Sequence, residues 1–225
     1  MQKGPVAADR ASQLNTPGTC VACGLAAQGY VGVHVCHACG VPQPLRPGED
    51  LFASFGLEQR FAIDSGLLER RFYEISRLLH PDRFAAIGGD ARRNSTERMT
   101  FLNDGYRILK NAEKRREWLL NQLAPAASPS SAPRPPQDLA SAWFDLQDDA
   151  NEAALKDFET RLQITQNQAH ERIRTLEREL DALLETGSKP GPELLAKMKA
   201  ELLSGSYLSS LERDVERLKK RLFIT

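Results

Sequence analysis

Apolar residues three and four positions apart recur through most of the chain after residue 49, and this helical period is what most limits its possible folds. From residue 138 onward the period has a polar gap at Thr165 and Gln166 and an interruption near SGS (204–206), and TGSKPGP (186–192) breaks it. It predicts one helix of about 35 residues and another of about 30, and the short turn between them favours antiparallel packing. The sequence therefore predicts an all-α protein.

Two proline-rich segments divide the chain. VPQPLRPG (41–48) has three prolines in eight residues, and APAASPSSAPRPPQ (124–137) is rich in proline, alanine and serine, so both are expected to be linkers. Residues 1–19 are polar without a period and are expected to be flexible. The division that follows has a small cysteine module at 20–40, a helical domain at 49–123, and a three-helix bundle with two long antiparallel helices at 138–225.

Charge and hydropathy exclude several classes of protein. The chain carries 30 basic and 30 acidic residues, and this balance argues against nucleic acid or an anionic membrane as its main partner. No apolar run approaches the roughly 20 residues that span a bilayer. The first residues, MQKGPVAADRASQLN, have neither the apolar core of a signal peptide nor the pattern of a mitochondrial presequence. A cytoplasmic protein is expected.

All four cysteines lie in two copies of the pattern C-x-A-C-G, with twelve residues between the inner cysteines. Two C-x-x-C turns can present four thiolates to one tetrahedral Zn²⁺, and the glycine after each pair lets the backbone turn over the metal. Two disulfides would need an oxidising compartment, and a redox pair usually sits in a thioredoxin-like βαβ setting. We expect structural zinc on Cys20, Cys23, Cys36 and Cys39, with His34 and His37 as bystanders.

The stretch RRFYEISRLLHPDRF (70–84) joins an amphipathic helix to the tripeptide His80-Pro81-Asp82. Pro81 is expected to end the helix, because it disfavours helical geometry at His80 and has no N–H. By itself this tripeptide could be simple helix punctuation. However, a short helix, a basic amphipathic helix, the tripeptide in a loop, a long helix and a short basic helix are predicted in that order within residues 49–123.

This order of elements resembles a J-domain, the module by which J-proteins activate DnaK-type chaperones. DLFASFGLEQRFAID, RRFYEISRLLHPDRF, LNDGYRILKNAEKRREWLL and the two-long-helix C-terminal half together resemble the HscB family of iron–sulfur co-chaperones, over residues 49–225. The double C-x-x-C resembles an N-terminal extension of some members. The resemblance implies a protein without catalytic activity, which raises the ATPase rate of an HscA or DnaK-type chaperone and presents the scaffold protein IscU to it. Because the first residues do not have the pattern of a transit peptide, the bacterial cytoplasm is expected rather than the mitochondrion.

The resemblance also implies which residues meet the chaperone. His80 and Asp82 would be contact residues, with Pro81 fixing the turn between them. A basic face would steer toward an acidic chaperone surface, although such a face is also typical of any solvated helix; it consists of Arg70, Arg71, Arg77 and Arg83. Arg115 and Arg116, in the last short helix, are expected to be solvated, and a minor role in docking stays open for them.

In the family an apolar patch binds the scaffold protein, and by motif alignment it falls on Ala140, Ser141, Phe144 and Tyr207. Two of these positions carry smaller side chains than in the family. Trp143, next to Phe144, adds an aromatic ring. Either the patch has shifted toward Trp143, Phe144 and Tyr207, or the scaffold contact is weaker. Alternatively, these aromatic residues fill the bundle core.

Two other functions remain open at this point. One is a general J-domain co-chaperone for other clients, and the other is a zinc-ribbon and coiled-coil adaptor in which the tripeptide is accidental. The sequence also leaves open whether the cysteine module serves stability, domain orientation or self-association as a homodimer.

Overall fold

The computed structural model describes residues 18–26, 28–84, 87–124, 137–148 and 151–223. Throughout these ranges the regular structure is helical, without strands and with two isolated β-bridges, so the predicted all-α class is confirmed. None of the described helices combines the length and apolar character needed to span a membrane. Residues 1–17 and most of the expected linker 124–137 lie outside the described residues.

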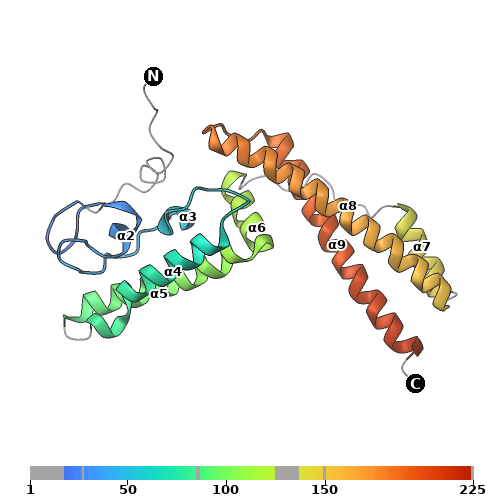
Figure 1. The fold of residues 1–225 in the computed structure, drawn as a ribbon, viewed down its shortest axis with the longest axis horizontal. Coiled ribbons are helices and arrows are strands. Elements are labelled where there is room, and N and C mark those ends of the chain that lie inside the picture. The colour runs from blue at the N-terminus through green and yellow to red at the C-terminus, as the bar shows by residue number, and fades with distance from the viewer. Residues whose placement is uncertain (1–17, 27, 85–86, 125–136, 149–150, 224–225) are drawn as a thin grey trace. The chain divides into compact units, whose positions relative to one another are not determined.

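The chain divides into two compact units, an N-terminal unit of residues 1–119 and a C-terminal unit of residues 120–225. Helices α2 to α5 and the 3-10 turn η1 lie within the first, and α6 begins in it. Their bounds are α2 Gly29–His34, α3 Leu51–Ser54, α4 Ser65–Leu79, η1 Pro81–Phe84, α5 Gly89–Lys110 and α6 Ala112–Leu123. Figure 1 shows α4 and α5 side by side and running in opposite directions.

Helix α4 has the boundaries that its local sequence predicts. Asp64 caps its first turn by accepting a hydrogen bond from the Leu67 N–H at 3.0 Å. Its apolar stripe faces the core, since Leu68 and Ile75 are fully buried. At the other end His80 leaves helical geometry with ψ of 124°, and Pro81 starts η1.

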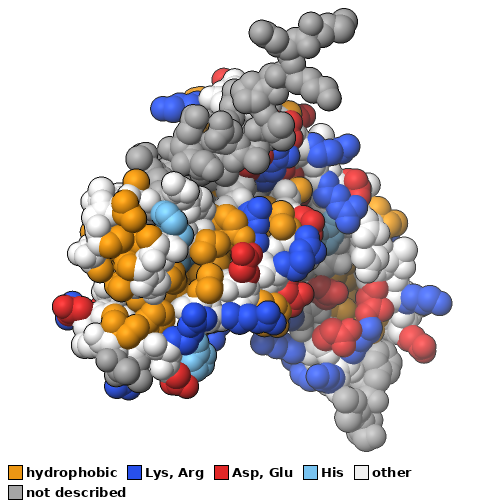
Figure 2. Space-filling view, turned by 60° about the vertical axis from the view of Figure 1, so that its left-hand side comes forward, with side chains coloured by type: hydrophobic (Ala, Val, Ile, Leu, Met, Phe, Trp, Pro, Cys, Tyr) orange, Lys and Arg blue, Asp and Glu red, His pale blue; other side chains and the backbone are white. Residues whose placement is uncertain are grey.

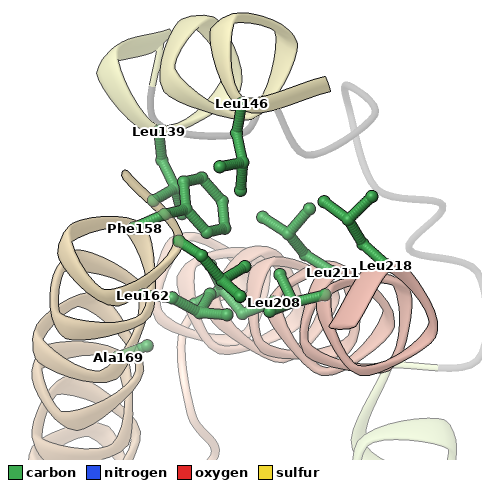
Figure 3. Packing of buried hydrophobic residues seen from close by; sticks show 10 residues of the cluster. Leu139, Leu146, Phe158, Leu162, Ala169, Leu208, Leu211 and Leu218 are labelled. Carbon is green, nitrogen blue, oxygen red and sulfur yellow. The ribbon is translucent and has the colours of Figure 1, made fainter. Parts of the chain in front are cut away.

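The C-terminal unit contains three helices, α7 (Gln137–Asp148), α8 (Glu152–Glu185) and α9 (Pro192–Phe223). The two long helices have 34 and 32 residues, close to the predicted lengths, and run antiparallel (Figure 1). Leucines from α7 and α9 meet the aromatic ring of Phe158 and the side chain of Leu162 from α8 (Figure 3). This shared apolar cluster holds the three helices together, because removing its surface from water is the main favourable contribution to folding.

Two sequence-based expectations are wrong. Segment 41–48 packs as part of the fold, with Pro42 and Gln43 buried, and is not a free linker. Arg115, expected to be solvated, is 8% exposed and donates hydrogen bonds to the carbonyl oxygens of Phe61, at 2.8 Å, and of Leu109. Its guanidinium thereby satisfies backbone groups that the fold removes from water.

Candidate functional site

The four cysteines converge on one point. Their Sγ atoms all lie within 4.8 Å of one another, with 3.6 Å between Cys20 and Cys39 and 3.7 Å between Cys23 and Cys36. Four thiolates at 2.3 Å from a tetrahedral ion would be about 3.8 Å apart. The cluster therefore has the donor set and the size to hold a metal ion.

Each cysteine pair sits in the same kind of turn. Gly24 and Gly40, which follow the two pairs, have φ of +72° and +71°, a region that other residues rarely adopt. The Gly24 N–H donates to the Cys20 carbonyl and the Gly40 N–H to the Cys36 carbonyl, both at 2.9 Å. The repeated pattern thus produces two matching turns that aim their sulfur atoms inward.

Backbone amides favour a thiolate at Cys20. Burial raises the pKa of this thiol, but hydrogen bonds from the N–H groups of Cys23 and Ala22, the latter 3.4 Å from Sγ, together with contacts to the thiols of Cys39 and Cys36, lower the pKa to about 6. Because metal ligands must be deprotonated, these amides favour Cys20 as a metal ligand. Backbone amides likewise lower the pKa of Cys36, whereas burial and the neighbouring thiols raise the pKa of Cys23 and of Cys39.

The two neighbouring histidines lie outside the sulfur cluster. His37 is exposed, whereas His34 is fully buried with Nε2 2.7 Å from the Ser54 carbonyl oxygen and Nδ1 3.1 Å from Arg98. Burial and the adjacent Arg98 lower the pKa of His34 to about 4, so the ring is neutral at physiological pH.

His80, Pro81 and Asp82, here called the HPD turn, lie between α4 and α5 at one end of this helix pair. The side chains of His80 and Asp82 are 60% and 90% exposed, and His80 Nδ1 lies 3.6 Å from a carboxylate oxygen of Asp82. Buried Phe84 anchors the following turn. The Ser95 hydroxyl of α5 donates to the carbonyl of Leu79, the last residue of α4. Buried contacts therefore fix the backbone on both sides of the HPD turn, while the side chains of His80 and Asp82 remain exposed to solvent.

The four arginines of the predicted basic face have different surroundings. Arg70 and Arg77 are exposed on α4. Arg71 donates to the carbonyls of Phe55, at 2.8 Å, and Gly56, which gives it a part in holding the turn after α3 (Leu51–Ser54). Arg83 donates to the Arg77 carbonyl at 3.1 Å. On the face shown in Figure 2, basic and acidic side chains are interspersed, in agreement with the net charge of zero.

The predicted scaffold-binding residues divide between surface and core. Phe144 is 66% exposed and Ser141 is exposed, while Ala140 is partly buried. Trp143 lies 5.5 Å from the Phe158 ring, and Tyr207 packs against the apolar cluster of the three helices. The exposed apolar surface at this place therefore centres on Phe144.

Sequence reasoning missed an open pocket of about 600 Å³ beside Trp143, between α7 and the C-terminal part of α9. Its other lining residues are mostly charged: Gln147, Asp214, Arg217, Lys220 and Arg221. Separate helices supply these side chains, so no local pattern in the sequence points to the pocket.

Sequence reasoning also missed a buried ion pair in the N-terminal unit. Arg98 of α5 and Glu49 lie 2.8 Å apart with side chains 0% and 1% exposed. Arg98 follows several polar residues on α5, so the sequence around it is that of a solvated helix face.

The sequence is 32% identical over 141 residues to the co-chaperone protein HscB homolog of Chromobacterium violaceum, an alignment that covers 60% of this chain and 77% of that protein. The chain belongs to the HscB family of co-chaperones. The resemblance drawn from the motifs is thereby confirmed, and an accidental HPD tripeptide in an adaptor is disfavoured. No protein-family model matches the sequence.

A solved structure of the HscB family has a similar fold. The crystal structure of human co-chaperone protein HscB superposes with a TM-score of 0.61 at 21% identity, covering 91% of this chain and all of that one. The chaperone HscB from Vibrio cholerae gives a TM-score of 0.49 at 25% identity, over 77% of this chain and 99% of that one. The human structure supports the fold assigned to this HscB-family chain.

Proposed function

We propose that this HscB-family chain activates the ATPase of an HscA or DnaK-type chaperone and delivers an IscU-type scaffold protein to it, in iron–sulfur cluster assembly in the bacterial cytoplasm. The observation that carries the proposal is the solvent-exposed HPD turn at one end of the α4–α5 pair, in a chain of this family. Its residues act by binding, and the chain itself catalyses no reaction.

In this proposal, His80 and Asp82 contact the chaperone while Pro81 holds the turn between them. Activation requires that the turn bind more tightly to the chaperone state from which hydrolysis proceeds than to the other state, because a ligand shifts an equilibrium only by its differential affinity. The exposure of both side chains leaves their polar atoms available to a partner. Arg70 and Arg77 add positive charge beside the turn, whereas Arg71 and Arg83 contribute chiefly by holding the local backbone.

The decisive substitution is His80→Gln, which removes the imidazole of an exposed residue. We expect ATPase stimulation to fall to the unstimulated rate of the chaperone while the fold is retained. The matched control is His170→Gln, the same change at an exposed histidine of α8. Steady-state ATP hydrolysis by a DnaK-type chaperone, titrated with each variant, measures the effect. Full stimulation by His80→Gln would contradict the role of the HPD turn.

Delivery of the scaffold protein is proposed to depend on the exposed ring of Phe144. Phe144→Ala removes apolar surface that is 66% exposed, so it should weaken IscU binding about tenfold or more while leaving the bundle stable. Ile164→Ala, at a side chain 51% exposed on α8, is the matched control. Calorimetric titration with IscU checks the result. If the unmodified chain does not bind IscU, a general J-domain co-chaperone for other clients is the better assignment.

The metal at the cysteine module is proposed to be zinc in a structural role. Cys20, Cys23, Cys36 and Cys39 would hold it, and four thiolates complete the tetrahedral coordination of Zn²⁺, so no position remains for a substrate. When bound, the ion would crosslink the two cysteine turns and so stabilise the folded module.

A further inference from the structure

Arg98 is buried at the centre of the N-terminal unit, and each of its N–H groups has an acceptor. Nε donates to the Gln43 carbonyl, and one Nη2 bond of 2.7 Å reaches the Pro44 carbonyl. Nη1 and Nη2 also reach the two carboxylate oxygens of Glu49, at 2.8 and 3.3 Å, and Nη1 lies 3.1 Å from His34 Nδ1. A guanidinium has five N–H donors, so this side chain is fully satisfied by groups that all lie before α3.

The contact with Arg98 also determines the tautomer of His34. Arginine can only donate, so Nδ1 of the neutral ring must accept and the ring proton must sit on Nε2. Nε2 then donates to the Ser54 carbonyl at 2.7 Å. His34, the last residue of α2 (Gly29–His34) in the cysteine module, is thereby tied to both α3 and α5.

Gln43 connects this buried network to the sulfur cluster. Its side-chain Nε2 donates to Cys20 Sγ at 3.3 Å and to the Val41 carbonyl at 2.8 Å, and its Oε1 accepts from the Val21 N–H at 3.2 Å. Its backbone accepts from Arg98. A single buried residue therefore spans the distance from a metal ligand to the guanidinium on α5.

Helix α5 continues the connection to the HPD turn. One helical turn before Arg98, Asn94 donates to the Pro42 carbonyl at 3.3 Å, so two buried residues attach α5 to segment 42–44. Between them, Ser95 donates to the carbonyl of Leu79, the residue that precedes His80. The same stretch of α5 thus holds the cysteine module on one side and the end of α4 on the other.

We propose that Gln43 and Arg98 make the four-cysteine site and the α4–α5 pair one cooperative unit, so that a metal ion bound at the cysteines stabilises the helices that carry the HPD turn. Gln43 is the positioning residue, because it acts on the metal through Cys20. This inference rests on the proposed metal binding and adds a role for it: metal supply controls how much of the chain can engage the chaperone. A ligand that binds only the folded state stabilises everything that unfolds with its site.

Coupling between two sites is reciprocal, so the network must also tune metal affinity. The test variant is Gln43→Met, which keeps the size of the side chain and the backbone carbonyl that accepts from Arg98, but removes the donor to Cys20 Sγ together with the side-chain hydrogen bonds to the Val41 carbonyl and from the Val21 N–H. Loss of such an outer partner of a metal ligand is expected to weaken zinc binding about 10- to 100-fold. The matched control is Gln59→Met in the same unit, which loses a contact with Asp50 but does not touch sulfur or Arg98.

Two measurements on the unmodified chain and on both variants test whether metal binding is coupled to the stability of α4 and α5. Zinc affinity is measured by competition with a chromogenic chelator, and hydrogen exchange of the α4 and α5 amides is followed with and without zinc. We expect zinc to slow exchange in both helices of the unmodified chain and of Gln59→Met, and to do so much less in Gln43→Met. A purely structural role for Gln43 would raise exchange equally with and without zinc, and would leave zinc affinity unchanged.

The failures are distinguishable. If the unmodified chain binds zinc but α4 and α5 exchange at the same rate without it, the coupling is overturned and the zinc site stands. If the chain binds no zinc, both the zinc site and the coupling are wrong.

Discussion

Gly105 lies inside α5 where α3 approaches it closely. A Cβ added there would overlap Leu51 Cδ1 and lie 3.2 Å from Phe55 Cε2, and both neighbours are buried. Gly205, inside α9, is a contrasting case, because the nearest atom to its added Cβ is Ile173 Cδ1 at an ordinary 3.9 Å. Glycine is thus required for close packing at position 105, whereas the packing around position 205 leaves room for a larger side chain.

Replacing each glycine by alanine should therefore have opposite effects. Alanine is better than glycine in a helix by about 1 kcal/mol, whereas overpacking a core costs about 1–3 kcal/mol. We expect Gly105→Ala to lower the free energy of unfolding of the N-terminal unit by about 1 kcal/mol. We expect Gly205→Ala to raise that of the C-terminal unit by about 0.5–1 kcal/mol.

Urea unfolding followed by tryptophan fluorescence measures both changes, since Trp118 and Trp143 are the two tryptophans and lie one in each unit. Trp143→Phe and Trp118→Phe backgrounds isolate the two signals. Stabilisation by Gly105→Ala would show that Leu51 moves aside at no cost, and would contradict the close packing of α3 on α5.

At the scale of the element, α4 combines two surfaces. Its buried stripe includes Leu68, Ile75 and Leu79, and Arg70 and Arg77 project to solvent. One face therefore belongs to the core of the N-terminal unit, and the other remains free to meet a partner beside the HPD turn.

The exposed arginines of α4 should contribute electrostatic attraction to the chaperone. Arg70→Ala with Arg77→Ala is expected to weaken chaperone binding about two- to fivefold for each charge removed, and to make binding less sensitive to salt. The control removes two exposed positive charges from α8, with Arg174→Ala and Arg178→Ala, and therefore has the same net charge as the α4 double variant. Affinity measured at two salt concentrations checks this, and equal losses in both variants would indicate an effect of net charge only.

At the scale of the molecule, each of the two units has buried apolar residues of its own, with a partly buried tryptophan packed beside them. The rings of Trp118 and Phe52 are tilted against each other with centroids 5.6 Å apart in the N-terminal unit, and Trp143 lies near Phe158 in the C-terminal unit. The cysteine module is buried against the first of these, through His34, Gln43 and Arg98. Metal removal should accordingly affect the two units differently.

Metal analysis is expected to find one zinc per chain. Its removal by a chelator should shift the unfolding transition seen by Trp118 to lower urea and leave the one seen by Trp143 in place, because a ligand stabilises only the unit that binds it. Single-tryptophan variants, unfolded with and without chelator, separate the transitions. Equal shifts of both would show that the two units unfold together.

Local interactions made much of this protein predictable from its sequence. The helical period, the cap at Asp64, the helix end before Pro81 and the two C-x-A-C-G turns all involve residues a few positions apart, so neighbouring residue types determine them. The HPD turn and the sulfur cluster were found in this way, and the motifs around them also identified the family.

Only the tertiary structure decided the roles of Arg98, Arg115 and Gln43. Arg98 finds its partners 49 to 64 positions away, and Arg115 finds the Phe61 carbonyl 54 positions away. A charged residue on a helix is expected to be exposed to solvent unless groups elsewhere in the fold satisfy its hydrogen bonds. The residues next to it in the sequence give no indication of such distant partners. The sequence by itself thus determined the helices, the cysteine turns and the HPD turn, and the burial of polar groups between distant segments decided how the cysteine module joins α5.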